Sequence, residues 1–404
     1  MKMKIIHTSD WHLGHRLYNY DRSDEEQRFF GQLADIAGKE RPDALVVAGD
    51  VFHTSAPGND VAKSFTDRLM EVVERCPGME TVVIAGNHDS YSRLVVDAAL
   101  WKRCRVHVFG MPAEDEEGDA VLDANIVEIA GKGFVAAVPF CHARNFPKVP
   151  DRFGVDRGKA YFAALSARLA ELNAGKGLPQ VLVAHLAAGK DTSFAGQDRL
   201  GVIGGEECVD PESLGSGYDY IALGHIHCPQ RVKGTGNTMV RYCGTPRAIH
   251  FDETYPHGVD VVEIAPGAEP AVRTVEFEPL RGLKTFGGAA GKPFGEALAD
   301  LAASDAGRGT YVRLNVSIGQ GELPGADWSE RARKTASEKG LRFCHVNPIR
   351  DGAAEEKAGE RIALTVDELK DLSADRVVGI LARRHPLTER QKALIGRLLE
   401  DPGK

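Results

Sequence analysis

Several short apolar runs end in polar side chains of the kinds that bind metals and move protons. The stretch "VIAGNHDS" at 83–90 breaks from a strand-like run into Asn87, His88 and Asp89. One such group is weak evidence, because Asn, His and Asp are ordinary turn residues. Four other runs end in the same way. Together the five runs supply Asp10, His12, Asp50, His53, Asn87, His88, Asp89, His185, His225 and His227.

This donor set predicts a site for divalent metals. Carboxylate, imidazole and amide donors without thiolate favour Mn²⁺, with Mg²⁺, Fe²⁺ or Zn²⁺ as possible occupants. Seven protein ligands would crowd one ion that must also leave a position for water, so two ions are expected, with the central Asp50 as their bridge. Two ions about 3.5–4 Å apart can activate water and neutralise phosphoryl oxygens, which predicts in-line displacement at phosphorus.

The three residues that follow the apolar run at 83–86 are expected to have different roles in this reaction. Asn87 is expected to be a neutral metal ligand. His88 would be free to protonate the leaving oxygen, and Asp89 would orient its imidazole. The alternative is that all these residues are satisfied polar groups at strand ends. Five strand ends would then bury many polar groups without a shared ion, which is costly.

Composition sets limits on the class of protein. The chain has 404 residues, more than one hydrophobic core usually supports. Its 50 basic and 58 acidic residues give a net charge of −8, which counts mildly against DNA unless bound cations or a partner supply positive charge. The seven cysteines form no CxxC pair. We expect reduced cysteines, no signal peptide, no membrane span and a cytoplasmic protein.

The patterning predicts an α/β architecture. The five apolar runs are typical of strands buried on both faces, and residues 23–38 read as a helix with a Ser23–Glu26 capping box. Strand and helix alternate over 1–230, and strands at 230–280 complete the same domain.

Two further segments follow the main domain. The Gly-rich stretch 281–293 is expected to be a boundary, and two strands and a helix beyond it suggest a small α/β domain. The last forty residues hold two amphipathic segments separated by Pro386, which pack on their own chain or await a partner helix. The expected divisions are 1–280, 281–358 and 359–404.

The motif series resembles a known family. "DWH", "GDVF", "GNHD", "AHL" and "GHIH" are similar to the motifs of calcineurin-like metallophosphoesterases over residues 10–227. More narrowly, "HTSDWHLG", "YIALGHIH" and "RYCGTP" resemble the nuclease subunits of bacterial SbcCD complexes, and that resemblance spans nearly the whole chain. It implies a sandwich of two sheets flanked by helices, with a capping domain and C-terminal helices.

The resemblance also implies roles for individual residues. The first metal site would hold Asp10, His12, Asp50 and His227, and the second Asp50, Asn87, His185 and His225. His88 would be the proton donor. His53 stands where many bacterial members carry Asp, and it could steer substrate, assist protonation or be a harmless surface residue.

The resemblance assigns partners as well. The segment 281–358 would position DNA, 359–404 would dock the coiled-coil base of the SbcC ATPase, and helices near 60–75 and 92–103 would form a homodimer within a heterotetramer. Arg247 is a candidate for phosphate contact and Trp328 for base stacking, although core packing suits Trp328 better.

The expected function is that of a Mn²⁺-dependent DNA nuclease. It would act as an exonuclease on duplex ends and an endonuclease on single strands and hairpins, with the partner ATPase controlling access. One alternative is a small-substrate metallophosphatase or cyclic-nucleotide phosphodiesterase with the same metal site. Another is a docking protein whose metal site is vestigial.

Overall fold

The computed structural model describes residues 2–150, 155–189, 208–233, 238–319 and 322–350. The chain separates into two compact units, one of residues 1–317 with 323–348 and one of 318–322 with 349–404. The predicted docking helices at 359–404 lie outside the described residues. The expected boundaries at 280 and 358 stay a prediction.

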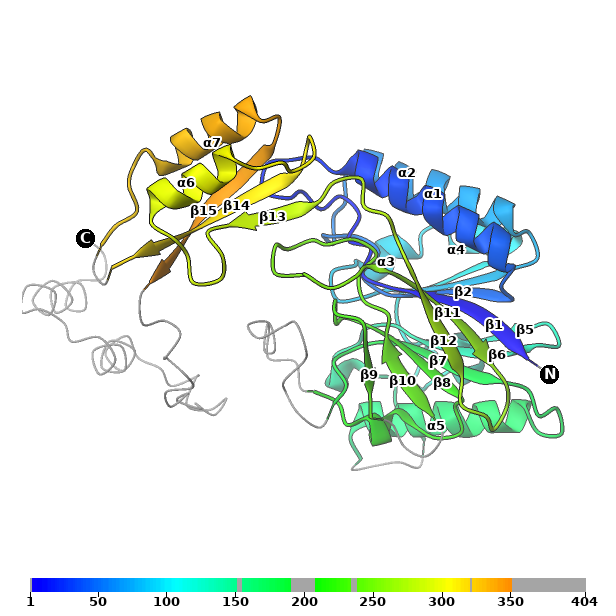
Figure 1. Cartoon of the computed structure of the whole chain (residues 1–404). Coiled ribbons are helices and arrows are strands. Elements are labelled where there is room, and N and C mark those ends of the chain that lie inside the picture. Colours follow the sequence, from blue (N-terminus) through cyan, green and yellow to red (C-terminus); the bar gives the residue numbers. More distant parts are fainter. Residues whose placement is uncertain (1, 151–154, 190–207, 234–237, 320–321, 351–404) are drawn as a thin grey trace, which may run out of the picture. The chain divides into compact units, whose positions relative to one another are not determined.

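Two six-stranded sheets form the main part of the first unit (Figure 1). The first sheet has the order β12-β11-β1-β2-β3-β4, and the second has the order β5-β6-β7-β8-β10-β9. Strands β1, β2, β3 and β4 are parallel, as are β6, β7, β8 and β10. The strands are β1 Met3–Thr8, β2 Ala44–Ala48, β3 Glu80–Ile84, β4 Val106–Phe109, β5 Ile126–Ile129, β6 Gly133–Val138, β7 Gln180–His185, β8 Tyr220–Gly224, β9 Gln230–Val232, β10 Met239–Tyr242, β11 Gly258–Ile264 and β12 Ala271–Glu276.

A third, three-stranded sheet follows, with the order β13-β14-β15. Its strands are β13 Leu283–Phe286, β14 Tyr311–Ile318 and β15 Arg342–Arg350. The described helices are α1 Ser23–Glu40, α2 Asn59–Arg75, α3 Tyr91–Leu94, α4 Ala98–Trp101, α5 Arg157–Leu172, α6 Phe294–Ala302 and α7 Trp328–Glu338.

Three apolar cores hold the layers together. Helices α1 and α2 pack on one face of the first sheet, where Leu33 and Leu69 join Val47 in a single cluster. Helix α5 covers the second sheet through Leu165. The inner faces of the two sheets meet in a third cluster that includes Val46 and Val183. The five apolar runs are strands of these sheets, and the expected sandwich flanked by helices is confirmed.

Helix α1 begins where the sequence indicated but is not capped as expected. Its N-cap is Arg22, which makes no side-chain cap hydrogen bond. Glu26 is buried and accepts hydrogen bonds from Gly14 N and Arg247 instead. The capping box was therefore wrong, because Glu26 turns inward to tie the loop after β1 to the helix layer.

The small sheet contains elements that the sequence did not reveal. The Gly-rich stretch read as a boundary contains β13, and α6 follows it. Trp328 opens α7 and stacks on Phe294 of α6, with ring centroids 4.9 Å apart and planes 6° apart. The packing alternative therefore holds for Trp328.

A buried carboxylate joins β14 to α1. Glu25 accepts hydrogen bonds from Arg22, from the Tyr311 hydroxyl at 2.6 Å and from Arg281 at 3.1 Å. Its pKa is lowered although burial alone would raise it, because Arg22 and Tyr311 donate to the carboxylate. These bonds fix the start of α1 beside the loop that carries the first motif.

No described helix combines the length and apolar character needed to cross a bilayer.

Trp11, between two of the predicted metal ligands, anchors the loop after β1. Its side chain is fully buried, Nε1 donates to Thr8 Oγ1 at 2.9 Å, and the ring meets Phe29 and Phe30 edge to face. Aromatic burial of this kind is a large part of core stability. The loop is thus held by the helix layer, away from the polar side chains it presents.

We predict that Trp11→Ala lowers the free energy of unfolding by about 3–5 kcal/mol, because it leaves a cavity under α1. Trp11→Phe keeps the ring contacts and loses the bond to Thr8, so it should cost about 1–3 kcal/mol. Urea unfolding of both variants measures this, with Leu280→Ala, at an exposed leucine, as control. Equal stability of wild type and Trp11→Ala would contradict the anchoring role.

Candidate metal centre

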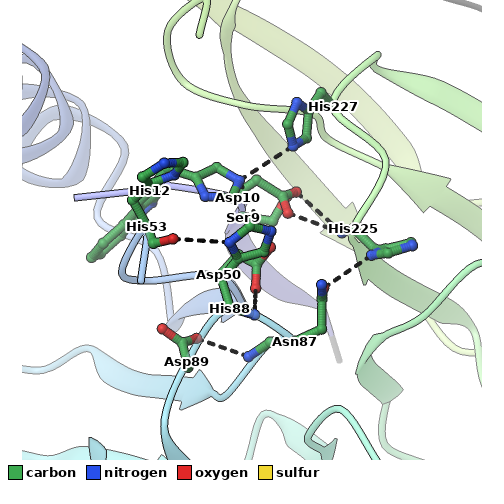
Figure 2. A network of polar contacts seen from close by, with 12 residues as sticks. Ser9, Asp10, His12, Asp50, His53, Asn87, His88, Asp89, His225 and His227 are labelled. Carbon is green, nitrogen blue, oxygen red and sulfur yellow. Dashed lines mark hydrogen bonds and ion pairs between the residues drawn. The ribbon is translucent and has the colours of Figure 1, made fainter. Parts of the chain in front are cut away.

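The predicted site residues come together at the carboxyl ends of five strands from both sheets (Figure 2). The loop after β1 supplies Asp10 and His12, and the loop after β2 supplies Asp50. Asn87 follows β3, and His185 ends β7. His225 and His227 follow β8. Parallel strands bring their carboxyl ends to one edge, and the two stacked sheets place both edges side by side.

Asp50 lies between two sets of imidazoles. Its Oδ2 is 3.7 Å from His12 Nε2, and its Oδ1 is 3.6 Å from His185 Nε2. The side chain is 3% exposed. One buried carboxylate therefore faces ligand atoms on two sides, as a bridge between two cations requires.

The first side of the site holds Asp10, His12 and His227. Their ligand atoms lie within 4.8 Å of one another. His12 Nε2 is 3.2 Å from His227 Nε2. His227 Nδ1 donates to Glu253 Oε1 at 2.8 Å, so the lone pair of neutral His227 is on Nε2 and faces His12. Burial lowers the pKa of His227, but the hydrogen bond to Glu253 and the negative charges of Asp10, Glu253 and Asp50 together outweigh burial, and the net pKa is raised.

The second side holds Asn87, His185 and His225. Asn87 Oδ1 lies 2.9 Å from His185 Nε2 and 3.2 Å from His225 Nδ1. His185 Nδ1 donates to Ala48 O at 2.8 Å, which directs the Nε2 lone pair into the site. Burial lowers the pKa of His185, and lowers that of His225 to about 3. Both imidazoles are therefore neutral, the form that binds metals.

The backbone at the site is strained. Seven described residues other than glycine have positive φ, and four of them are predicted ligands: Asp10 (53°), His12 (45°), Asp50 (51°) and His225 (100°). Such conformations cost about 1–3 kcal/mol each and persist only where the surroundings enforce them. Backbone bonds enforce them here, because Asp10 N donates to Gly49 O at 2.9 Å and His12 N to Asp50 O at 3.0 Å.

Glycines before two of the ligand groups are required by close approach. A Cβ at Gly86 would lie 2.1 Å from Asp50 Oδ1, and one at Gly224 would lie 1.8 Å from Ala48 O. Neither position has room for a side chain. The glycines of "GNHD" and "GHIH" therefore let the loops of the two sheets approach Asp50.

His88 lies beside the two sets of proposed metal ligands and is held by two hydrogen bonds (Figure 2). Its backbone N donates to Asp50 Oδ1 at 2.9 Å, and its Nδ1 donates to the His53 carbonyl at 2.9 Å. The His53 and His88 rings stack with centroids 5.8 Å apart. His12, His53 and His88 form a third group of potential ligands.

Asp89 has a different place from the one expected. Its carboxylate accepts hydrogen bonds from the backbone N–H groups of Val51 (3.1 Å), Phe52 (2.8 Å) and Gly86 (2.8 Å). Among the described contacts, the His88 imidazole is oriented by the His53 carbonyl and not by Asp89. The orienting role of Asp89 was wrong, because three backbone amides bind its carboxylate and make it a brace between the β2 and β3 loops.

Arg247 is also placed differently. It is 8% exposed and donates to His12 O at 3.1 Å and to Glu26 at 2.9 Å. This buried pair supports the loop after β1. The phosphate-contact alternative does not suit a side chain so enclosed.

The donor set fits divalent metal ions. The Nε2 lone pair of His227 faces His12 Nε2 at 3.2 Å, and that of His185 faces Asn87 Oδ1 at 2.9 Å. Opposed lone pairs repel unless a cation or proton lies between them. The oxygen and nitrogen donors, without thiolate, suit borderline or hard ions.

Comparisons with known proteins show the family of the chain. Residues 3–229 match the family model of the calcineurin-like phosphoesterases. The SbcD protein of the SbcCD nuclease from Rhodobacter capsulatus is 34% identical over 66% of this chain and 68% of its own length. The SbcD protein of Bacillus subtilis is 28% identical over 91% of both chains, and that of Escherichia coli is 31% identical over 62% of both.

The sequence analysis missed Glu253. It lies in the loop before β11, outside every strand-end motif, and only the fold brings it to His227. Its second oxygen accepts from Ile249 N at 2.8 Å, which fixes the carboxylate. A carboxylate behind a metal-binding imidazole orients the ring and raises its basicity.

We predict that Glu253→Gln weakens divalent metal binding about 10- to 100-fold, the usual cost of losing such a carboxylate. Isothermal titration with Mn²⁺ measures it. Glu269→Gln, which alters an exposed pair with Arg231, is the control. Unchanged metal affinity in Glu253→Gln would show that Glu253 does not support the site.

Proposed function

Because this chain belongs to the calcineurin-like phosphoesterase family and, within it, to the SbcD nucleases, we propose that it hydrolyses DNA phosphodiester bonds with two bound divalent cations, preferably Mn²⁺. The chain is a metal-dependent nuclease. The observation that carries the proposal is the position of the Asp50 carboxylate between two sets of imidazoles, with His88 beside it.

The proposed metal ligands are divided between two positions. Asp10, His12, Asp50 and His227 would hold one ion, and Asp50, Asn87, His185 and His225 the other. When bound, such ions supply an activated water and neutralise charge on the phosphoryl oxygens. The buried hydrogen bonds from His227 to Glu253 and from His185 to Ala48 O keep these two imidazoles in the ligand tautomer.

His88 is the proposed proton donor. The His53 carbonyl can only accept a hydrogen bond, so Nδ1 of His88 carries a proton. When the ring is protonated at Nε2 as well, this second proton can pass to the departing sugar oxygen, which leaves the neutral imidazole with its proton on Nδ1. Asp50 holds the His88 backbone, which fixes the ring relative to the ligands. His53 supports this ring through its carbonyl and its stacked imidazole. Asp89 contributes by bracing the two loops.

The wider role follows the relatives. We place the chain in the cytoplasm as the nuclease component of an ATP-dependent DNA end-processing complex with an SbcC ATPase. It would cut duplex ends as an exonuclease and single strands or hairpins as an endonuclease. The segment 281–358 would help to position DNA, and 359–404 would dock the ATPase.

A homodimer within this assembly is supported by an exposed apolar surface. Tyr91, Val96 and Leu100 are 58%, 74% and 62% exposed and lie on or between α3 and α4, where one helix over 92–103 was expected. Clustered exposed apolar side chains mark interaction sites. This surface and helix α2 are the proposed contact between two copies.

A small-substrate phosphatase would share the metal centre. Efficient turnover of simple phosphomonoesters together with inert DNA would favour that rival.

We predict that His88→Ala lowers cleavage of a linear duplex with Mn²⁺ by about 10²- to 10⁴-fold, the contribution of a general acid. Metal content should stay the same, because His88 is not one of the proposed ligands. His107→Ala, on β4 with its Nε2 near Glu80, is the matched control. Undiminished cleavage by His88→Ala would refute the donor assignment, and loss of bound metal would make His88 a ligand.

We predict that Leu100→Asp converts the chain from dimer to monomer, because it puts a charge in the proposed apolar contact. Light scattering after gel filtration should show twice the chain mass of 43.7 kDa for wild type and a single mass for the variant. Leu280→Asp, at another exposed leucine, should remain dimeric. A monomeric wild type at micromolar concentration would contradict the dimer.

A further inference from the structure

A pocket of about 220 Å³ opens beside the metal centre. We call it the Phe140 pocket. It lies among the loops after β3, β4 and β6. Its lining residues are Ala85, Gly86, Asn87, Asp89, Tyr91, Gly110, Met111, Phe140, Cys141, His142 and Asn145. Because Asn87 belongs to both, whatever fills the pocket lies next to the group held at the metals.

The lining has the chemistry of a site for a flat, uncharged ring. Tyr91, Met111 and Phe140 offer aromatic and thioether surface. Phe140 is fixed by its backbone bond to Ala85 O at 2.9 Å and meets the His142 ring edge to face at 5.1 Å. The Asn145 side-chain amide makes no hydrogen bond to any described residue, so its donors and acceptor are available to a ligand.

The charge of the pocket excludes a phosphate as its occupant. No Lys or Arg is among the lining residues. The one carboxylate, on Asp89, is bound by three backbone amides. An anion would find no positive partner there, whereas a neutral heterocycle can stack on the aromatic face and bond at its edge.

We propose that the Phe140 pocket receives an unpaired nucleobase of the strand being cut, from a nucleotide next to the scissile phosphate. The inference rests on the proposed nuclease function. The volume of the pocket, about 220 Å³, suits this occupant. A cavity of about 150 Å³ holds a benzene ring, and a nucleobase is somewhat larger. Phe140 and Tyr91 provide the stacking surface, and Asn145 and His142 the polar edge.

The pocket would also select among DNA forms. A paired base must leave its stack to enter, and this costs free energy that a single strand, a hairpin loop or a frayed end does not require. The same metal centre would therefore cut unpaired strands in preference to the interior of a duplex.

An abasic scan of the wild-type chain tests the pocket without any substitution. Single-stranded oligonucleotides carry one tetrahydrofuran residue, moved by one position at a time, and cleavage with Mn²⁺ is measured at each bond. The expected result is slower cleavage, about 5- to 150-fold, at one bond at a fixed offset from the missing base, which is the range covered by base stacking on aromatic side chains.

A double variant, His142→Ala with Asn145→Ala, connects this effect to the pocket. Both side chains are exposed, so the fold should be retained, and thermal melting checks this. The variant should discriminate less against the abasic residue. Arg144→Ala changes the same turn without lining the pocket, and it should keep the full discrimination.

The outcomes separate the inference from the proposed function. Wild-type cleavage that ignores the abasic position would overturn the nucleobase site while leaving the nuclease intact. Discrimination unchanged in the double variant would also overturn it. Failure to cut unmodified DNA, with small phosphoesters hydrolysed, would contradict the proposed function itself.

Discussion

Burial of several carboxylates at the meeting point of two sheets is the constraint on which this structure depends. Asp10, Asp50 and Asp89 are 0%, 2% and 9% exposed, and a buried charge is costly unless it is compensated. Each is compensated differently. Asp89 binds three backbone amides, and Asp10 accepts from Ser9 Oγ at 2.6 Å and from His225 N. Asp50 accepts from His88 N and faces the imidazoles. Asp89 is thus a structural brace, whereas Asp10 and Asp50 turn toward ligand nitrogens.

The backbone strain has the same origin. In an extended strand the side chains of Asp10 and His12 would lie on the same face but side by side, so the loop must turn sharply to bring their ligand atoms within 4.8 Å of one another. The left-handed conformations at these residues and at Asp50 provide the turns. Trp11 points the opposite way into the helix layer, and burial of its indole offsets the cost of the turn. The motif "DWH" therefore both presents two ligands to the site and anchors their loop in the helix layer.

Much of this arrangement could be predicted from the sequence, since it follows from the apolar runs and from the polar residues that end each run. Five runs in Val, Ile, Leu and Ala predicted β1, β2, β3, β7 and β8, and the fold brings together the polar residues that follow them. Contacts between distant loops could not be predicted in this way. Glu253 has no strand-end signature, and the brace made by Asp89 depends on amides from the β2 loop. Short elements such as β13 were hidden because four residues with a central lysine carry little periodic signal.

The distribution of charge explains how an acidic chain can act on a polyanion. None of the ten predicted site residues is Lys or Arg, and the chain carries a net charge of −8. Attraction for the scissile phosphate must then come from the cations that the carboxylates and imidazoles bind, since these are the largest local positive charges such a site can hold. The Phe140 pocket beside them, whose lining has no Lys or Arg, adds affinity through stacking, which needs no positive charge. Binding to phosphate and binding to base are thus separated across Asn87, the residue common to both.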